Sequence, residues 1–165
     1  MNTTKKTEET SKTLGAELKA RGLVLSTAES CTGGGIAAAI TDVPGSSEWF
    51  SGGFVTYANE WKMRQLGVMA ETLEGFGAVS AQTVSQMLDG LLANGGADLG
   101  IAVSGIAGPG GGVPGKPVGT VFIGIAGAGW QVIRRVLFEG DRAFVRAQTI
   151  EEALGMMLDA IRRKG

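Results

Sequence analysis

The chain of 165 residues contains no histidine and a single cysteine, Cys31. Without histidine, a serine or cysteine nucleophile has no imidazole base. A serine nucleophile can use a lysine as its base instead. One cysteine forms no intrachain disulfide and supplies too few thiolates for a cysteine-ligated zinc site. No group of Asp and Glu with metal-ligand spacing is present either. We therefore expect no metal site.

The chain also lacks a charge excess and a long apolar run. Its 15 basic and 16 acidic residues give a net charge of −1, which provides no general attraction for nucleic acid phosphates or acidic lipids. The chain has no run of about 18 apolar residues, the length that a membrane-spanning helix needs. The polar N-terminus also lacks the apolar core of a signal peptide. We expect a cytoplasmic protein that binds a small molecule and neither nucleic acid nor membrane.

Glycine, in contrast, is abundant, with 28 residues, and 44% of the chain is hydrophobic. The glycines cluster at residues 33–35, 52–53 and 105–115, between apolar segments, as is typical of turns and of sites of close approach. The length suits one domain over residues 1–165, with a large core and with residues 1–9 frayed.

Apolar periodicity and cap residues predict an alternation of helices and strands that ends in a hairpin. We expect helices at 10–21, 33–41, 59–66, 81–94 and from 142 onward, and strands at 23–27, 53–58, 99–104, 118–126 and 130–138. Gly22 and Gly67 are predicted to end helices, and Ser80 and Asp141 to cap them. This order predicts an α/β fold, a three-layer α/β/α sandwich with a mixed, mostly parallel sheet.

The first candidate site is the turn after the strand at 23–27. Ser30 and Thr32 supply hydroxyl groups, and the backbone at Gly33 and Gly34 opens a helix, so the turn can hold an anion. The alternative is a small-residue turn that only lets the helix pack closely. The turn lacks the lysine of a phosphate loop, so we do not expect nucleoside triphosphate binding.

The second candidate site follows the strand at 99–104 and begins at Ser104 and Gly105. Its glycine pattern reverses the dinucleotide fingerprint, and Pro114 and Pro117 prevent a following helix, which excludes a Rossmann cofactor site. A loop whose backbone approaches a ligand and a flexible crossover both fit this pattern.

The third candidate site combines Ser46, Ser47, Tyr57 and Lys62. Lys62 lies five residues after Tyr57 across a strand-to-helix turn, so both can face one cleft. A lysine acts as a base only when it is neutral, which requires desolvation or a nearby positive charge to lower its pKa. The alternative is an ordinary solvated lysine.

Three further residues have a chemical and a structural interpretation. Cys31 is either a nucleophile near a helix N-terminus or a small buried thiol, and the lack of a histidine base favours the thiol. Arg142 and Arg146 share a helix face at i and i+4. They form either a clamp for a phosphate or carboxylate or a solvated face.

Six ordered motifs carry a resemblance to a known family. They are TAESCTGG at 27–34, PGSSEWF at 44–50, GFVTYANEWK at 53–62, GAVS at 77–80, SGIAGPGGG at 104–112 and KPVGTV at 116–121. Over residues 10–160 the chain resembles the CinA C-terminal domain family, the competence/damage-inducible family whose stand-alone members are nicotinamide-nucleotide amidases.

The resemblance implies hydrolysis of nicotinamide mononucleotide to nicotinate mononucleotide and ammonia, without a cofactor. It also implies Ser47 as the nucleophile, Lys62 as its base and Tyr57 as an assisting group. For such a reaction, we expect backbone groups near Ser46 and Ser47 or at the glycine turns to stabilise the oxyanion. We expect the 5′-phosphate to bind at a helix N-terminus or at an arginine, with Arg142 as the candidate. We further expect a homo-oligomer. The alternative is a non-enzymatic nucleotide-binding or regulatory module, which has no need of a neutral lysine beside a serine.

Overall fold

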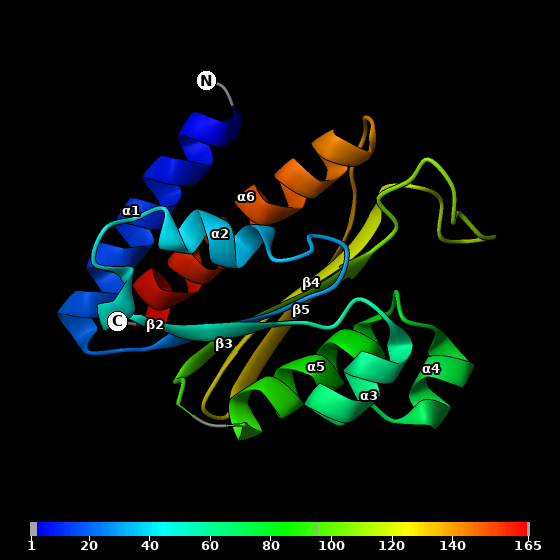
Figure 1. The fold of residues 1–165 in the computed structure, drawn as a ribbon, viewed down its shortest axis with the longest axis horizontal. Coiled ribbons are helices and arrows are strands. Elements are labelled where there is room, and N and C mark those ends of the chain that lie inside the picture. Colours follow the sequence, from blue (N-terminus) through cyan, green and yellow to red (C-terminus); the bar gives the residue numbers. More distant parts are fainter. Residues whose placement is uncertain (1–2, 95, 165) are drawn as a thin grey trace.

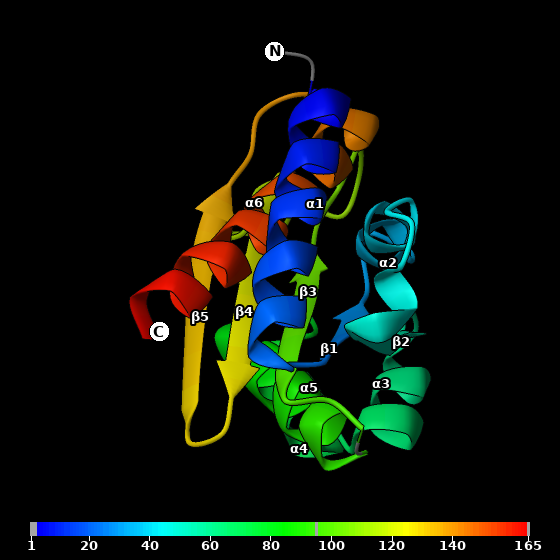
Figure 2. The same cartoon turned by 90° about the vertical axis from the view of Figure 1, so that its left-hand side faces the viewer.

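A computed structural model describes residues 3–94 and 96–164 as one sheet with helices on both faces (Figures 1 and 2). The strands are β1 (Leu25–Glu29), β2 (Phe50–Val55), β3 (Leu99–Gly105), β4 (Thr120–Gly127) and β5 (Trp130–Leu137). Helices α1 (Thr3–Arg21), α2 (Gly35–Thr41) and α6 (Arg142–Lys164) cover one face. Helices α3 (Asn59–Leu66), α4 (Ala70–Phe76) and α5 (Ala81–Ala93) lie on the other. The three-layer α/β/α sandwich is confirmed.

The sheet is mixed, with the strand order β2-β1-β3-β4-β5. Strand β1 pairs in parallel with both β2 and β3, whereas β4 pairs antiparallel with β3 and β5. The chain therefore leaves β1 toward β2 on one side and later returns to β3 on the other. In open α/β sheets, ligands bind beyond the carboxyl ends of the strands at such a switch point.

Alternation along the central strands builds two cores. On β3, Ile101 and Val103 face the α1, α2 and α6 layer, while Ala102 faces α5. On β4, Ile123 faces the first layer and Phe122 the second. This period of two is what a strand covered on both faces requires. The sheet is therefore held from both sides, and its carboxyl edge is a fixed platform for a site.

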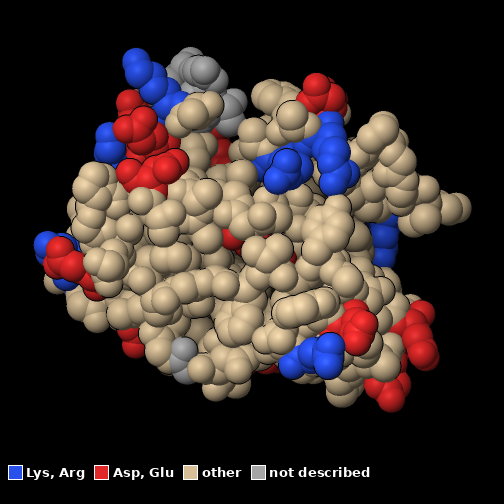
Figure 3. All heavy atoms as spheres, viewed as in Figure 1, with Lys and Arg blue, Asp and Glu red and all other residues tan. Residues whose placement is uncertain are grey.

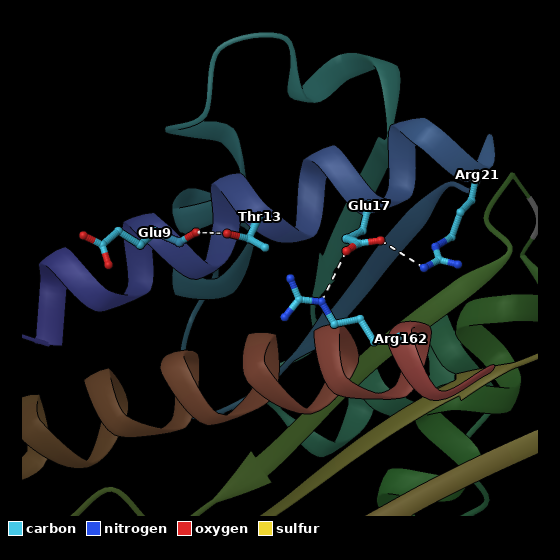
Figure 4. A network of polar contacts seen from close by, with 5 residues as sticks. All are labelled: Glu9, Thr13, Glu17, Arg21 and Arg162. Atoms are coloured by element: carbon cyan, nitrogen blue, oxygen red, sulfur yellow. Dashed lines mark hydrogen bonds and ion pairs between the residues drawn. The ribbon is translucent and has the colours of Figure 1, made fainter. Parts of the chain in front are cut away.

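Helix α1 begins at Thr3 rather than at the predicted residue 10, so the expectation of a frayed start is wrong for residues 3–9. Packing against α6 explains the difference. Glu17 accepts hydrogen bonds from Arg21 and from Arg162 of α6 (Figure 4). Lys6 also pairs with Glu151 of α6. Residues 1 and 2 of the predicted frayed start lie outside the described residues.

Most predicted helix ends are confirmed. Gly22 and Gly67 have positive φ angles of 64° and 69° just after α1 and α3, which suits the left-handed position that ends a helix. The Ser80 hydroxyl accepts the Thr83 N–H at 3.1 Å, and Asp141 accepts the Phe144 N–H at 2.9 Å.

The predicted hairpin is also confirmed as β4 and β5, whereas α4 and the short 3₁₀ helix η1 (Ser46–Glu48) were not predicted. Strand β2 begins at Phe50, three residues before the predicted start. Among the described helices, none is long and apolar enough to cross a membrane.

Candidate active site

Ser30 is the first residue beyond β1, at the carboxyl edge of the sheet. Its backbone N–H donates to the Val103 carbonyl oxygen on β3 at 3.1 Å, which extends the pairing of the two strands by one residue. Its side chain is almost completely buried. Ser30 is thus held between β1 and β3 by the sheet itself, a rigid support for a reactive hydroxyl group.

Lys62 lies on α3, which follows β2, and its side chain points back to the same edge. The residue is 1% exposed. Its Nζ donates to Ser30 Oγ at 3.0 Å, to the Thr56 carbonyl oxygen at 2.7 Å and to the Tyr57 carbonyl oxygen at 3.1 Å. No ion pair with a carboxylate is recorded for Lys62 within the described part of the chain. Burial without a counter-charge lowers the pKa of Lys62 from 10.5 to about 8.

The three acceptors around Lys62 define how a neutral amine would sit. A carbonyl oxygen can only accept, so Thr56 and Tyr57 require two N–H groups from Nζ. A neutral amine has two N–H groups and one lone pair, and the third direction leads to Ser30 Oγ. On deprotonation of Lys62, the Ser30 hydroxyl becomes the donor and Nζ the acceptor. This is the hydrogen bond that a lysine base needs.

A cleft of about 280 Å³ opens over this pair. It is lined by Ser30, Cys31, Tyr57, Lys62, Ala78, Val79, Ser104, Gly105, Ile106, Ala107, Gly108, Gly110, Gly111 and Arg142. On the face drawn in Figure 3, the Lys and Arg side chains form small, separate groups on a largely uncharged surface. Among the described residues that line the cleft, only Lys62 and Arg142 are of a charged type, so the cleft combines a buried hydroxyl–amine pair with a mostly uncharged wall.

Arg142 and Tyr57 stand together at the mouth of the cleft. Arg142 donates to the Gly108 carbonyl oxygen at 2.8 Å through Nη1 and to the Tyr57 hydroxyl at 2.9 Å through Nη2. The Tyr57 residue is 58% exposed. The structure thus brings the predicted residues Tyr57, Lys62, Ser104, Gly105, Arg142 and Ser30 to one cleft.

Thr32, Gly33 and Gly34 form the turn behind Ser30 rather than the wall of the cleft. The buried carboxylate of Glu29 accepts the Thr32 hydroxyl at 2.6 Å and the backbone N–H groups of Ile36 and Ala37 at 2.8 and 3.0 Å. Glu29 therefore caps α2 and fixes the turn that carries Ser30. Glu29 was not among the residues predicted from the sequence, although its position directly before Ser30, at the end of a strand, was a signal.

Arg146 supports the same turn from the other side. Its Nε donates to the Cys31 carbonyl oxygen at 3.1 Å and its Nη2 to the Thr32 carbonyl oxygen at 3.0 Å. The two alternatives for Arg142 and Arg146 were a clamp and a solvated face. The structure does not place both residues on one ligand, because of the two only Arg142 lines the cleft.

Cys31 follows Ser30 directly, but its side chain is buried. Burial raises the pKa of the Cys31 thiol to about 11, with a smaller contribution from the nearby Glu29 carboxylate. The thiol is therefore protonated at neutral pH and is a poor nucleophile. The interpretation of Cys31 as a small buried thiol is confirmed.

The predicted contact between Ser47 and Lys62 is wrong. Ser46 and Ser47 lie in η1, before β2 begins, whereas Lys62 follows the carboxyl end of β2. A strand of six residues spans about 20 Å. The two serines therefore lie at the end of the sheet where β2 begins, opposite to the end that carries Lys62. Neither of them lines the cleft. The strand predicted between Ser47 and Lys62 was the signal that could have shown this.

The fold and the site together define a class: an α/β protein with a buried serine–lysine pair at the switch point of a mixed sheet. The model of the CinA C-terminal domain matches residues 7–161, and the chain belongs to this family.

Similar proteins support the assignment to the family. The nicotinamide-nucleotide amidohydrolase PncC of Enterobacter agglomerans is 54% identical over 145 residues, 87% of this chain and 88% of that protein. The protein of the same name from Escherichia coli (strain K12) is 52% identical over the same shares. The crystal structure of the competence damage-inducible protein A (ComA) from Klebsiella pneumoniae subsp. pneumoniae MGH 78578 has a TM-score of 0.92 and 41% identity. The superposed region covers 94% of this chain and 97% of the Klebsiella chain.

Proposed function

We propose that this chain is an amidohydrolase that converts nicotinamide mononucleotide to nicotinate mononucleotide and ammonia, with Ser30 as the nucleophile and Lys62 as the general base. The observation that carries the mechanism is the 3.0 Å contact between Lys62 Nζ and Ser30 Oγ in a buried place. The substrate is proposed from the names of the relatives that are about half identical to this chain.

Acylation begins when the neutral Lys62 amine takes the Ser30 proton. Ser30 Oγ then forms a bond to the carboxamide carbon, and the carbonyl oxygen gains the negative charge. As the tetrahedral intermediate collapses, the C–N bond breaks and Lys62 delivers its proton to the leaving nitrogen, so that ammonia departs. This cycle restores the neutral amine and leaves an ester on Ser30.

Deacylation uses the same two groups in the reverse roles. Lys62 takes a proton from a water molecule, and the water oxygen bonds to the ester carbon. The bond to Ser30 Oγ then breaks, and the proton held by Lys62 returns to Ser30. The products are a free serine and the carboxylic acid, which ionises to nicotinate mononucleotide by releasing its proton to water or to the departed ammonia.

The oxyanion requires backbone donors beside Ser30. The Ser30 carbonyl oxygen accepts the Gly33 N–H at 3.0 Å and so points into the turn. Because C=O and N–H of one trans peptide point in opposite directions, the Cys31 N–H points away from the turn. We assign the Cys31 N–H as one oxyanion donor.

Arg142 is the proposed anchor for the 5′-phosphate. It is the only Arg among the described residues that line the cleft, and its two hydrogen bonds hold its guanidinium group at the mouth, beside Tyr57. A phosphate held there would position the carboxamide over Ser30 from a distance, which is how remote binding assists the chemical step. Tyr57 assists by orienting Arg142.

Ammonia release from nicotinamide mononucleotide by the purified protein tests the proposal, with nicotinate mononucleotide identified as the second product. Lys62→Met is the control, since it removes the base but keeps an apolar chain of similar length. Binding of the nucleotide without turnover would replace this proposal by the non-enzymatic module. The homo-oligomer, the absence of nucleic acid binding and the cytoplasmic location stay predictions.

A further inference from the structure

We propose that Ser104 determines specificity for a carboxamide by accepting a hydrogen bond from the amide N–H of the substrate. This inference rests on the proposed function and goes beyond it, because it assigns the group that distinguishes the amide substrate from its carboxylate product. Ser104 lies near the carboxyl end of β3 and is 1% exposed. It lines the cleft together with Ser30 and Lys62.

The hydrogen bonding of Ser104 leaves its oxygen only one role. Ser104 Oγ donates to the Ala78 carbonyl oxygen at 2.8 Å. A carbonyl oxygen cannot donate, so the direction of this bond is fixed, and the single proton of the hydroxyl group is used. Toward the cleft Ser104 can therefore present lone pairs alone. A ligand group that meets them must be a donor.

The position of Ser104 places this acceptor beside the reacting group. Ser30 is bound through its N–H to Val103, the residue before Ser104. Glu29 pairs with Val103 in the register of β1 and β3, so Ser30 and Ser104 are the next residues along neighbouring strands, and both line the cleft. We infer that a carboxamide carbon within reach of Ser30 Oγ lies near Ser104 as well. The carboxamide has two N–H donors, whereas the carboxylate product has none. A buried acceptor that loses its donor and meets a second acceptor weakens binding.

Binding measurements on the Ser30→Ala protein, which leaves the amide intact, test the inference. The Kd values of nicotinamide mononucleotide and nicotinate mononucleotide are compared at about pH 9, where Lys62 is mostly neutral and does not attract the carboxylate. Adding Ser104→Ala should reduce the ratio of the carboxylate Kd to the amide Kd by about tenfold, the usual effect of one lost hydrogen bond. In Ser104→Ala alone, with Ser30 present, the ratio of the product Ki to the substrate KM should fall by a similar factor.

Thr83→Val is the matched control. The Thr83 hydroxyl donates to the neighbouring Gly77 carbonyl oxygen at 2.7 Å and does not line the cleft. Thr83→Val should therefore leave the ratio of the two Kd values unchanged, even if the loop around Gly77 becomes less well held. Ser104→Cys, which keeps the size but weakens the acceptor, serves as the second variant, with a reduced ratio expected again.

The outcomes distinguish a failure of the Ser104 role from a failure of the proposed function. An unchanged ratio in both Ser104 variants, with amidase activity present in the unmodified protein, would overturn the role of Ser104 and leave the proposed function standing. Equal weakening of both ligands would have the same meaning, because it shows a structural role only. Absence of ammonia release by the unmodified protein would overturn the proposed function and this inference together.

Discussion

Raising the pH from 7 to 9 should increase kcat/KM for nicotinamide mononucleotide about tenfold. The perturbed group is Lys62, whose pKa burial lowers to about 8. Only the neutral amine can take the Ser30 proton, and its fraction rises from roughly 0.09 at pH 7 to roughly 0.9 at pH 9. Well below pH 8 the logarithm of kcat/KM should therefore rise with a slope that approaches one per pH unit, and it should level off above pH 9.

The assay is the initial rate of ammonia release at substrate concentrations far below KM, because kcat/KM reports the protonation of the free protein. Lys62→Arg is the control. A guanidinium group stays charged up to a pKa above 12, so this variant should be inactive at every pH of the series. A flat profile between pH 6 and 9, or activity that falls as the pH rises, would refute a lysine base.

Three further results are expected. Arg142→Ala should lower kcat/KM for the mononucleotide at least tenfold and leave weak activity on the riboside nearly unchanged, since two or three charge-assisted bonds to phosphate are lost; an equal loss on both substrates would exclude the phosphate anchor. Arg146→Met should lower kcat about tenfold or more through the unsupported turn of Cys31 and Thr32, whereas the exposed Arg162→Ala should not. The free energy of unfolding of the unmodified protein minus that of Lys62→Met should rise by up to about 3 kcal/mol from pH 8 to 10.5. In this range Lys62 is protonated in the unfolded chain and mostly neutral in the folded one, so folding becomes more favourable as the pH rises. A difference that stays constant with pH would contradict the lowered pKa.

The sequence was sufficient for the architecture because local signals and the final fold agree. Gly22, Gly67, Ser80 and Asp141 all occupy the helix ends that their chemistry predicts. The alternation in β3 and β4 is also clear. In contrast, helix α4 has weak signals of its own, and the start of α1 depends on contacts with α6, which no local pattern contains.

The sequence identified most residues of the cleft as candidates, but it did not predict which serine contacts Lys62. Lys62 and Ser30 were both candidates, yet Lys62 was paired with Ser47, because the family resemblance implied this pair and the two residues are close in sequence. The parallel arrangement of β1 and β2 reverses this expectation, since it brings the residues after both strands to one edge. Ser30, which is 32 positions from Lys62, is therefore its neighbour.

Supporting residues were the hardest to predict. The Glu29 carboxylate binds three donors, and Arg146 binds two carbonyl oxygens, but neither interaction follows from a sequence pattern. A buried acid beside a small-residue turn has many structural explanations. Only the positions of the backbone groups show that it holds the turn of the proposed nucleophile.

A parallel measurement of Ser30→Ala and Ser47→Ala tests the central claim most directly. Both changes remove one hydroxyl group, and both proteins can be checked for folding by thermal unfolding before ammonia release is measured. Loss of a nucleophile lowers the rate by about a thousandfold or more. The proposed mechanism predicts that loss for Ser30→Ala and activity within about twofold of the unmodified protein for Ser47→Ala. Near-normal turnover in Ser30→Ala, with activity lost in Ser47→Ala, would contradict it.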